Sequence, residues 1–93
     1  MTTRVVYSRR AAAEVEEITA SLAEHSPPAA ERFLEALGRA EQQLSEFPNS
    51  GAPGLRPGTR RLVVGNYTVS YRRRRAEVEI FAVRNARRRD ARP

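Results

Sequence analysis

Apolar side chains recur with helical spacing near the start of the chain. From Arg9 to about Glu24 the larger ones stand at i, i+3 and i+7, and alanines extend the stripe. This spacing places them on one side of an α-helix, while most of the glutamates fall outside it. The stripe consists of Ala11, Ala12, Val15, Ile18 and Leu22. The pattern predicts an amphipathic helix over residues 9–24.

A second helical stripe follows a short interruption. Residues 25–28 read His-Ser-Pro-Pro, and Ser followed by Pro at the first helical position is a start signal. We therefore expect a helix from about Pro27 to Glu46. Its apolar positions are Ala30, Phe33, Leu34, Leu37, Ala40, Leu44 and Phe47. Two helices separated by so short a break are expected to lie antiparallel, as a hairpin.

β-Branched and aromatic runs flank the helical region and predict strands. Val5 to Tyr7 form the first run, and Ser8 after them is typical of a helix N-cap. Residues 48–58 are rich in Pro and Gly and indicate a crossing loop. Beyond it, alternation predicts three strands, containing Leu62 and Val64; Tyr67, Val69 and Tyr71; and Val78, Ile80 and Ala82 with Phe81 and Val83 on the other face. Gly65-Asn66 suits a two-residue hairpin turn.

The predicted order is strand, helix, helix, strand, strand, strand, which is an α+β fold. A helical hairpin with one apolar side must cover a sheet, so we expect two layers with a mainly antiparallel four-stranded sheet. We assign residues 1–88 to a single domain and residues 89–93 to a frayed basic tail. Only 19 of the 93 residues are Val, Ile, Leu or Phe. The core is therefore expected to be thin, with some apolar surface left open for a partner.

The charges are segregated along the chain. A net charge of +6 comes from 17 arginines and 11 acidic residues, with no lysine. Residues 11–47 hold eight glutamates and two arginines, whereas residues 48–93 hold twelve arginines and three acidic residues. An acidic helical half thus precedes a basic sheet half, which gives the molecule two surfaces of opposite potential.

Composition also narrows the chemistry and the compartment. The chain has no Cys, which excludes a disulfide framework, a thiolate nucleophile and a Cys-based zinc site. Its apolar runs are far shorter than the ~20 residues of a membrane span, and its first residues lack the hydrophobic region of a signal peptide. We expect a soluble cytoplasmic protein that uses no metal or other cofactor.

Several short motifs, taken in order, resemble one known family. They are Val5-Val6-Tyr7-Ser8, Ala12-Ala13-Glu14, Glu17-Ile18, Pro28 to Phe33, Leu44, Phe47-Pro48, Gly51, Pro57-Gly58, Arg60-Arg61-Leu62, Tyr67 to Tyr71 and Val78 to Val83. In this order and spacing the chain resembles the RelE/ParE toxins of type II toxin-antitoxin systems over residues 4–88. The resemblance implies the α+β fold predicted above.

The two branches of this family differ in chemistry. RelE-like toxins cut mRNA on the ribosome, where basic side chains with a Glu, His or Tyr activate the 2′-hydroxyl. ParE-like toxins lack that set, act on DNA gyrase and block replication. Deciding between the branches depends on whether the chain holds an acid and a base beside its arginines.

The acid and base candidates are few. The single His, His25, is expected in the break between the helices, and no Tyr follows Tyr71. Glu46, Glu77 and Glu79 are interpreted as solvated carboxylates. We therefore favour a ParE-like gyrase inhibitor without a catalytic site of its own. The alternatives are a RelE-like ribosome-dependent mRNA endoribonuclease and a simple nucleic-acid-binding module.

Arginines at strand ends are the candidates for binding the target. Guanidinium groups bind carboxylates and phosphates in a bidentate manner. The resemblance implies gyrase as the partner, so these arginines are expected to contact gyrase, its bound DNA or a carboxylate of the antitoxin. The alternative for these arginines is a solvated strand end, which we favour for Arg72–Arg75. We expect one edge of the sheet to gather the candidates, which are Arg60, Arg61, Arg84, Arg87 and Arg88. Tyr67 and Tyr71 share a strand face with Val69 and are expected to pack in the core.

The resemblance further implies a cognate ParD-like antitoxin that forms a hetero-oligomer with the chain. Its C-terminal segment would wrap the toxin and insert apolar side chains against the helices and the sheet. A thin core agrees with this, because such a segment would complete the burial of exposed apolar groups. The candidate contacts are Leu22, Phe33, Leu37, Leu55 and Val63.

Overall fold

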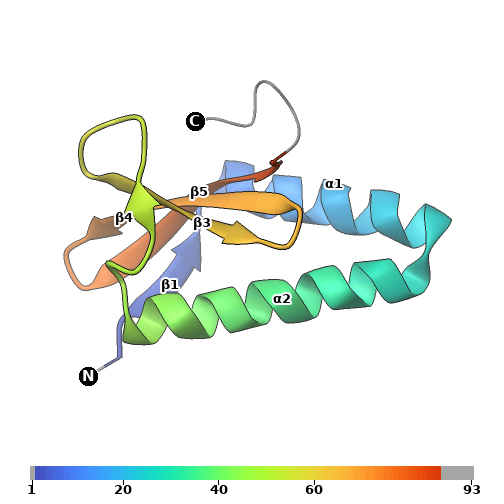
Figure 1. Ribbon diagram of the computed structural model, residues 1–93, viewed down its shortest axis with the longest axis horizontal. Coiled ribbons are helices and arrows are strands. Elements are labelled where there is room, and N and C mark those ends of the chain that lie inside the picture. Colours follow the sequence, from blue (N-terminus) through green and yellow to red (C-terminus); the bar gives the residue numbers. More distant parts are fainter. Residues whose placement is uncertain (1, 87–93) are drawn as a thin grey trace.

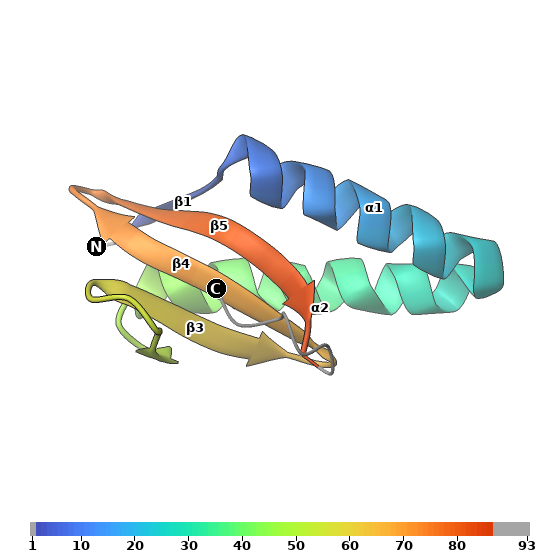
Figure 2. The same ribbon diagram turned by 90° about the horizontal axis from the view of Figure 1, so that it is seen from above.

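Two helices cover one face of a five-stranded sheet in the computed structural model, which describes residues 2–86 (Figures 1 and 2). The elements in chain order are β1 (Arg4–Tyr7), α1 (Arg9–His25), α2 (Pro27–Glu46), β2 (Ala52–Pro53), β3 (Thr59–Val64), β4 (Tyr67–Arg74) and β5 (Glu77–Asn85). The strand order is β1-β5-β4-β3-β2, with β1 parallel to β5 and every other pair antiparallel. The α+β fold and the helical hairpin are confirmed.

The sheet has one strand more than predicted. Ala52 and Pro53, in the loop rich in Pro and Gly, pair with Arg61 and Arg60 of β3. Two residues are too few to give a periodic pattern, so the sequence predicted only a crossing loop there. The predicted domain boundary at residue 88 and the tail at 89–93 lie outside the described residues.

Serine side chains begin both helices, as the sequence predicted. The Ser8 hydroxyl accepts a hydrogen bond from Ala11 N at 3.0 Å, and the Ser26 hydroxyl accepts one from Ala29 N at 3.3 Å. The Ser26 backbone N–H also donates to Leu22 O at 2.7 Å. One residue therefore ends α1 and begins α2, which makes the hairpin connection as short as the Ser-Pro signal indicated.

A β-bulge changes the alternation of β5. Ser70 of β4 pairs with Ala82, and the next residue, Tyr71, pairs with Ile80, so Phe81 has no partner across the strands. Val83 then pairs with Val69, which lies in the core. Directly opposed residues share a face of the sheet, so Val83 faces the helices and Ala82 faces away. The prediction that Ala82 shares a face with Val78 and Ile80, and that Val83 lies opposite, is wrong because a bulge reverses the alternation.

The core lies between α2, the sheet and the inner side of α1. Its buried residues are Ala11, Phe33, Leu37, Ala40, Leu44, Val64, Val69, Tyr71, Val78, Ile80 and Val83. The predicted packing of Tyr71 and Tyr67 is confirmed, since Tyr71 is fully buried and Tyr67 packs against the core with its ring 4.8 Å from that of Phe33. Within residues 2–86 no helix is both long and apolar enough to cross a bilayer.

The two helices contribute unequally to this core. Ala11 is the only fully buried residue of α1, whose Val15, Ile18 and Leu22 are partly buried. Two residues of the predicted α2 stripe are exposed instead, because Leu34 is 46% accessible and Phe47 is 62% accessible. α1 thus adds one fully buried residue and three partly buried side chains to the core.

A hydrogen bond between two side chains joins β1 to α2. The Tyr7 hydroxyl donates a hydrogen bond to Glu41 Oε2 at 2.5 Å between groups 34 residues apart in sequence. Burial raises the pKa of Tyr7 far above its usual 10.0, and the hydrogen bond to Glu41 and the charge of that carboxylate raise it further. Ionised Tyr7 would lose the hydrogen bond and repel Glu41, so the folded state retains the phenol proton.

We expect Tyr7→Phe to lower the free energy of unfolding by about 1–2 kcal/mol at pH 7, because the hydrogen bond to a carboxylate is lost. Above pH 10 the unfolded tyrosine ionises while folded Tyr7 stays protonated, so wild-type stability falls as the pH rises. The variant lacks this loss, and urea titrations from pH 7 to pH 11 should show the difference narrowing above pH 10. A constant difference across that range would contradict the assignment.

Candidate functional site

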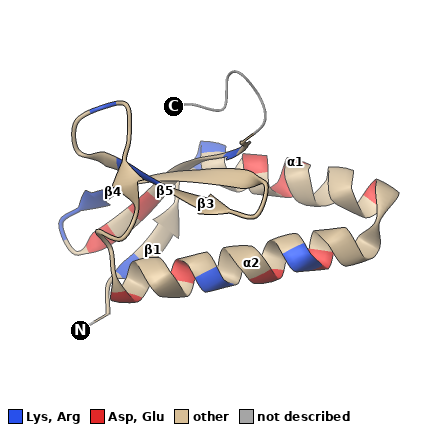
Figure 3. Cartoon of the chain, viewed as in Figure 1, with Lys and Arg blue, Asp and Glu red and all other residues tan. Residues whose placement is uncertain are grey.

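Arginines gather at one end of the sheet, where the β4–β5 turn and the loop between β2 and β3 lie (Figure 3). Arg72–Arg75 approach and enter this turn, and all four are exposed. Because β3 runs antiparallel to β4, Thr59 at the start of β3 pairs with Arg72. The helix surfaces, in contrast, carry charges of both signs (Figure 3). The arginine-bearing end of the sheet is thus the most basic feature of the described chain.

Arg60 has a structural partner within this region. Its guanidinium donates from Nη1 to Gly51 O at 2.8 Å, and the N–H of Gly51 donates to the hydroxyl of buried Tyr71 at 2.9 Å. A Cβ at Gly51 would lie 2.6 Å from Arg61 O and 2.7 Å from the Tyr71 hydroxyl, so only glycine fits there. Arg60 therefore anchors the segment after α2, and its guanidinium is not a free binding group.

The strand order separates the predicted arginine candidates. Arg61 pairs with Ser70 in the middle of β4, and Arg84 pairs with Thr68, two residues earlier on the same strand. Both face away from the helices, on the two strands that flank β4, whereas Arg60 pairs with Tyr71 and faces the helices. The candidates are therefore not all on one side: the alternation of β3 puts Arg60 on the face opposite to Arg61 and Arg84. Arg87 and Arg88 lie outside the described residues.

Glu14 of α1 is a binding group that the sequence did not indicate as such. β1 stops pairing at Tyr7, opposite Ile80, and so leaves the later part of β5 without a strand on that side. Glu14 Oε1 accepts a hydrogen bond from Val83 N at 2.9 Å, and its Oε2 lies 3.5 Å from Arg84 Nε. Glu14 stands three residues after Ala11 and four before Ile18, so a carboxylate on the apolar side of α1 was the available signal.

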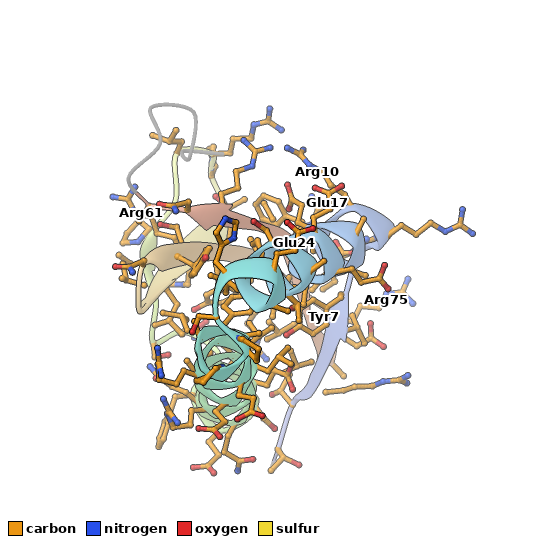
Figure 4. All side chains as sticks on the ribbon, turned by 90° about the vertical axis from the view of Figure 1, so that its right-hand side faces the viewer. Tyr7, Arg10, Glu17, Glu24, Arg61 and Arg75 are labelled. Carbon is orange, nitrogen blue, oxygen red and sulfur yellow. The ribbon has the colours of Figure 1, made fainter. Side chains whose placement is uncertain are left out.

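A cleft of about 490 Å³ lies beside this contact, between α1 and the C-terminal part of β5. Its walls combine apolar, acidic and basic groups, and one of them is Glu17 of α1, which is labelled in Figure 4. The lining residues are Glu14, Glu17, Ile18, Ser21, Leu22, Tyr67, Val83, Arg84 and Asn85. Leu22 is the one predicted antitoxin contact that lines this cleft.

The other predicted antitoxin contacts divide into buried and exposed residues. Phe33 and Leu37 are 6% and 4% accessible and belong to the core, so their prediction as surface contacts is wrong. Leu55 and Val63 are 59% and 68% accessible, as the prediction required. Periodicity identifies the apolar side of an element but not the neighbour that covers it, which explains both the error here and the unexpected exposure of Leu34 and Phe47.

The acid and base candidates are dispersed. His25 ends α1, where its Nδ1 lies 3.0 Å from Ser21 O, and the helix junction is at the opposite end of the molecule from the β4–β5 turn (Figure 1). Glu46 accepts a hydrogen bond from Gln42. Glu79 faces away from the helices, where its Oε1 lies 3.0 Å from Arg72 Nε and 3.5 Å from Arg74 Nη1. This carboxylate neutralises and orders arginines.

Comparison with known proteins identifies the family. The family described as ParE toxin of type II toxin-antitoxin system, parDE, matches residues 5–90. The chain belongs to the ParE toxin family. The matched residues include both helices and all five strands except Arg4, the first residue of β1. The match therefore covers the whole fold.

Individual relatives agree with this assignment. The chain is 38% identical over 85 residues to "Putative toxin Y4kP" of Sinorhizobium fredii (strain NBRC 101917 / NGR234), covering 89% of this chain and 88% of the relative. A solved chromosomal ParDE TA system from P. aeruginosa matches with a TM-score of 0.77 at 21% identity, covering 90% of this chain and 96% of that one. An archaeal RelE-RelB complex from Pyrococcus horikoshii OT3 matches with a TM-score of 0.54 at 17% identity, covering 95% and 99%. The last two likenesses show the shared fold of this ParE family member.

The partners of Arg60 and Arg61 predict different effects on stability. We expect Arg60→Ala to lower the free energy of unfolding by about 1–2 kcal/mol, because the partly buried hydrogen bond to Gly51 O is lost. Arg61→Ala should change it by less than about 0.5 kcal/mol, because Arg61 makes no side-chain bond within residues 2–86. Urea unfolding of both variants checks this, and equal losses would contradict the anchoring role of Arg60.

Glu14 offers a second test of how the layers are joined. We expect Glu14→Ala to cost about 1–3 kcal/mol, because the Val83 N–H loses its acceptor and Arg84 loses a carboxylate. Glu14→Gln, which keeps a neutral acceptor, should fall between this variant and the wild type. Glu17→Ala is the matched control, since Glu17 is exposed one position before Ile18 on the same helix. Similar unfolding curves for Glu14→Ala and Glu17→Ala would refute the linking role.

Proposed function

We propose that this ParE family member inhibits DNA gyrase and thereby DNA replication, in the cytoplasm, and that a cognate ParD-like antitoxin neutralises it. The observation that carries the proposal is the family match over residues 5–90. Gyrase inhibition is the activity that the resemblance to ParE-like toxins implies. The proposed mode of action is binding, in which the toxin blocks gyrase without a reaction of its own.

The positions of the ionisable groups support binding rather than RNA cleavage. A general base must lie within hydrogen-bond reach of the proton that it removes. Among the described residues, Glu79 is held by Arg72 and Arg74 as an ion-pair partner, and His25 is at the far end of the helical hairpin. Arginine remains protonated at neutral pH, so the basic end of the sheet is suited to binding anions.

The exposed apolar side chains support an antitoxin that wraps around the toxin. They come from the helices, the loop and the sheet rather than from one compact surface, and they are Leu34, Phe47, Leu55 and Val63. An extended segment can contact dispersed apolar groups in succession, ordering as it binds. The cleft between α1 and β5, with Leu22 in its wall, gives such a segment a further apolar contact.

A supercoiling assay tests the gyrase target. Purified toxin is added to gyrase and relaxed plasmid, and in parallel to a cell-free translation reaction. We expect supercoiling to fall, cleaved plasmid to accumulate and translation to continue, with supercoiling restored by an equimolar amount of antitoxin. Arg61→Ala should weaken inhibition about tenfold, the effect of losing an interface interaction of ~1.4 kcal/mol.

Arg32→Ala, which removes the same charge from an exposed position of α2, is the matched control and should inhibit as the wild type does. Translation arrest with unchanged supercoiling would refute gyrase as the target and favour the RelE-like alternative. Equal weakening by Arg61→Ala and Arg32→Ala would exclude Arg61 as a specific contact.

A further inference from the structure

Two hairpin turns in the sheet have the same length and different chemistry. The β3–β4 turn is Gly65-Asn66, enclosed by the pair Val64 and Tyr67, and the β4–β5 turn is Arg75-Ala76, enclosed by Arg74 and Glu77. The first turn residue has φ +59° at Gly65 and φ +58° at Arg75. Glycine adopts this conformation without cost, whereas a side chain with a Cβ is strained in it. In residues 2–86, Arg75 is the only residue other than glycine with a positive φ.

The strain at Arg75 has no compensating contact in the described chain. Arg75 is exposed and makes no hydrogen bond or ion pair there, and its side chain points away from the fold (Figure 4). A strained residue whose cost no contact offsets is a reason to look for a functional role. The residue type itself is therefore the informative feature of this turn.

The neighbouring arginines alternate between the two faces of the sheet, since Arg73 pairs with Val78 of the core and lies on the helix-facing side. Arg72 and Arg74 face away from the helices, where both approach Glu79, and the Arg72 guanidinium lies 5.2 Å from the centre of the Phe81 ring. These contacts hold the two strand-borne side chains in place. Arg73 and Arg75 are exposed and unpaired within residues 2–86. We call Arg72–Arg75 the arginine tip.

We propose that the arginine tip binds the phosphate backbone of duplex DNA. Arginine also occurs at the centres of protein interfaces, but the tip has no apolar side chain beside its arginines except Ala76 of the turn. Four consecutive arginines place a high positive charge at one exposed end of the sheet, and arginine binds phosphates in a bidentate manner. The choice of DNA rests on the proposed gyrase target, since gyrase holds duplex DNA.

Binding to DNA without gyrase tests this directly. The probe is a fluorescein-labelled duplex of about 30 base pairs, and its dissociation constant is measured with the full chain over a series of salt concentrations. Each phosphate contact contributes about 0.9 to the slope of log K against log salt. We expect Arg73→Gln with Arg75→Gln to lower the slope by about 1.8. Arg32→Gln with Arg39→Gln, which removes two exposed charges from α2, should leave it unchanged.

A single substitution separates binding from folding. Arg75→Gly relieves the strain and removes one cation, so the melting temperature should rise by about 4–8 °C while the salt slope falls by about 0.9. Arg75→Asn, which also tolerates positive φ, should behave in the same direction. A more stable variant that binds DNA as the wild type does would show that Arg75 has no part in binding and would overturn the proposal.

Three further results would each overturn the proposal that the arginine tip binds duplex DNA. Equal loss in the tip and α2 double variants would show binding by net charge alone and overturn the proposal. Tighter binding to RNA of the same length would assign the tip to RNA, and loss of gyrase binding with unchanged DNA binding would assign it to a protein surface; either overturns the proposal. Because gyrase is absent from the DNA measurement, failure there leaves the supercoiling assay as an independent test of the proposed function.

Discussion

The β-bulge at Phe81 is the constraint on which the second half of the sheet depends. Without it, strict alternation would place Ala82 and Arg84 toward the helices and Val83 toward solvent. With it, Ile80 and Val83 both enter the core and Arg84 remains outside. The bulge also follows the last pair between β1 and β5, at Tyr7 and Ile80. The Val83 N–H then faces α1, where Glu14 accepts its hydrogen bond.

The segregated charges have a structural use inside the molecule as well as on its surface. The acidic half supplies Glu14, which binds the backbone of β5 and lies near Arg84, and Glu41, which accepts a hydrogen bond from Tyr7 of β1. Both contacts join a helix to the sheet. α1 has a single fully buried residue, Ala11, and its larger apolar side chains are only partly buried, so burial stabilises its packing less than it would if they were fully covered. Carboxylates thus contribute to the contact between layers that larger domains obtain from a deeper core.

The sequence was sufficient to predict every element except the two-residue strand β2, and it was insufficient to predict which elements pack against one another. Periodicity and capping serines gave both helices, because these signals are local. The bulge at Phe81 was not predictable, since the run Phe81-Ala82-Val83 has no polar position to mark the change of face. The candidate site was the part that the sequence predicted least well. Arg60, Arg61 and Arg84 look alike in sequence, and only the strand pairing shows that Arg60 faces the helices while the other two face away. Glu14 joins α1 to β5 because β1 ends at Tyr7 and leaves the Val83 N–H without a strand partner, and this depends on the tertiary structure.

Arginine is the only basic residue type with a fixed charge in this chain, yet its copies have different roles. Arg60 donates a hydrogen bond to Gly51, and Arg84 lies near Glu14. Replacing either arginine therefore removes a contact within the fold as well as a surface charge. Arg72 and Arg74 are ordered by one carboxylate, which leaves the pair with a net positive charge. A count of charges therefore does not identify a binding site. The surroundings of each arginine are more informative: where the β3–β4 turn has glycine at its first position, the β4–β5 turn has Arg75, in a strained conformation and without a partner in residues 2–86.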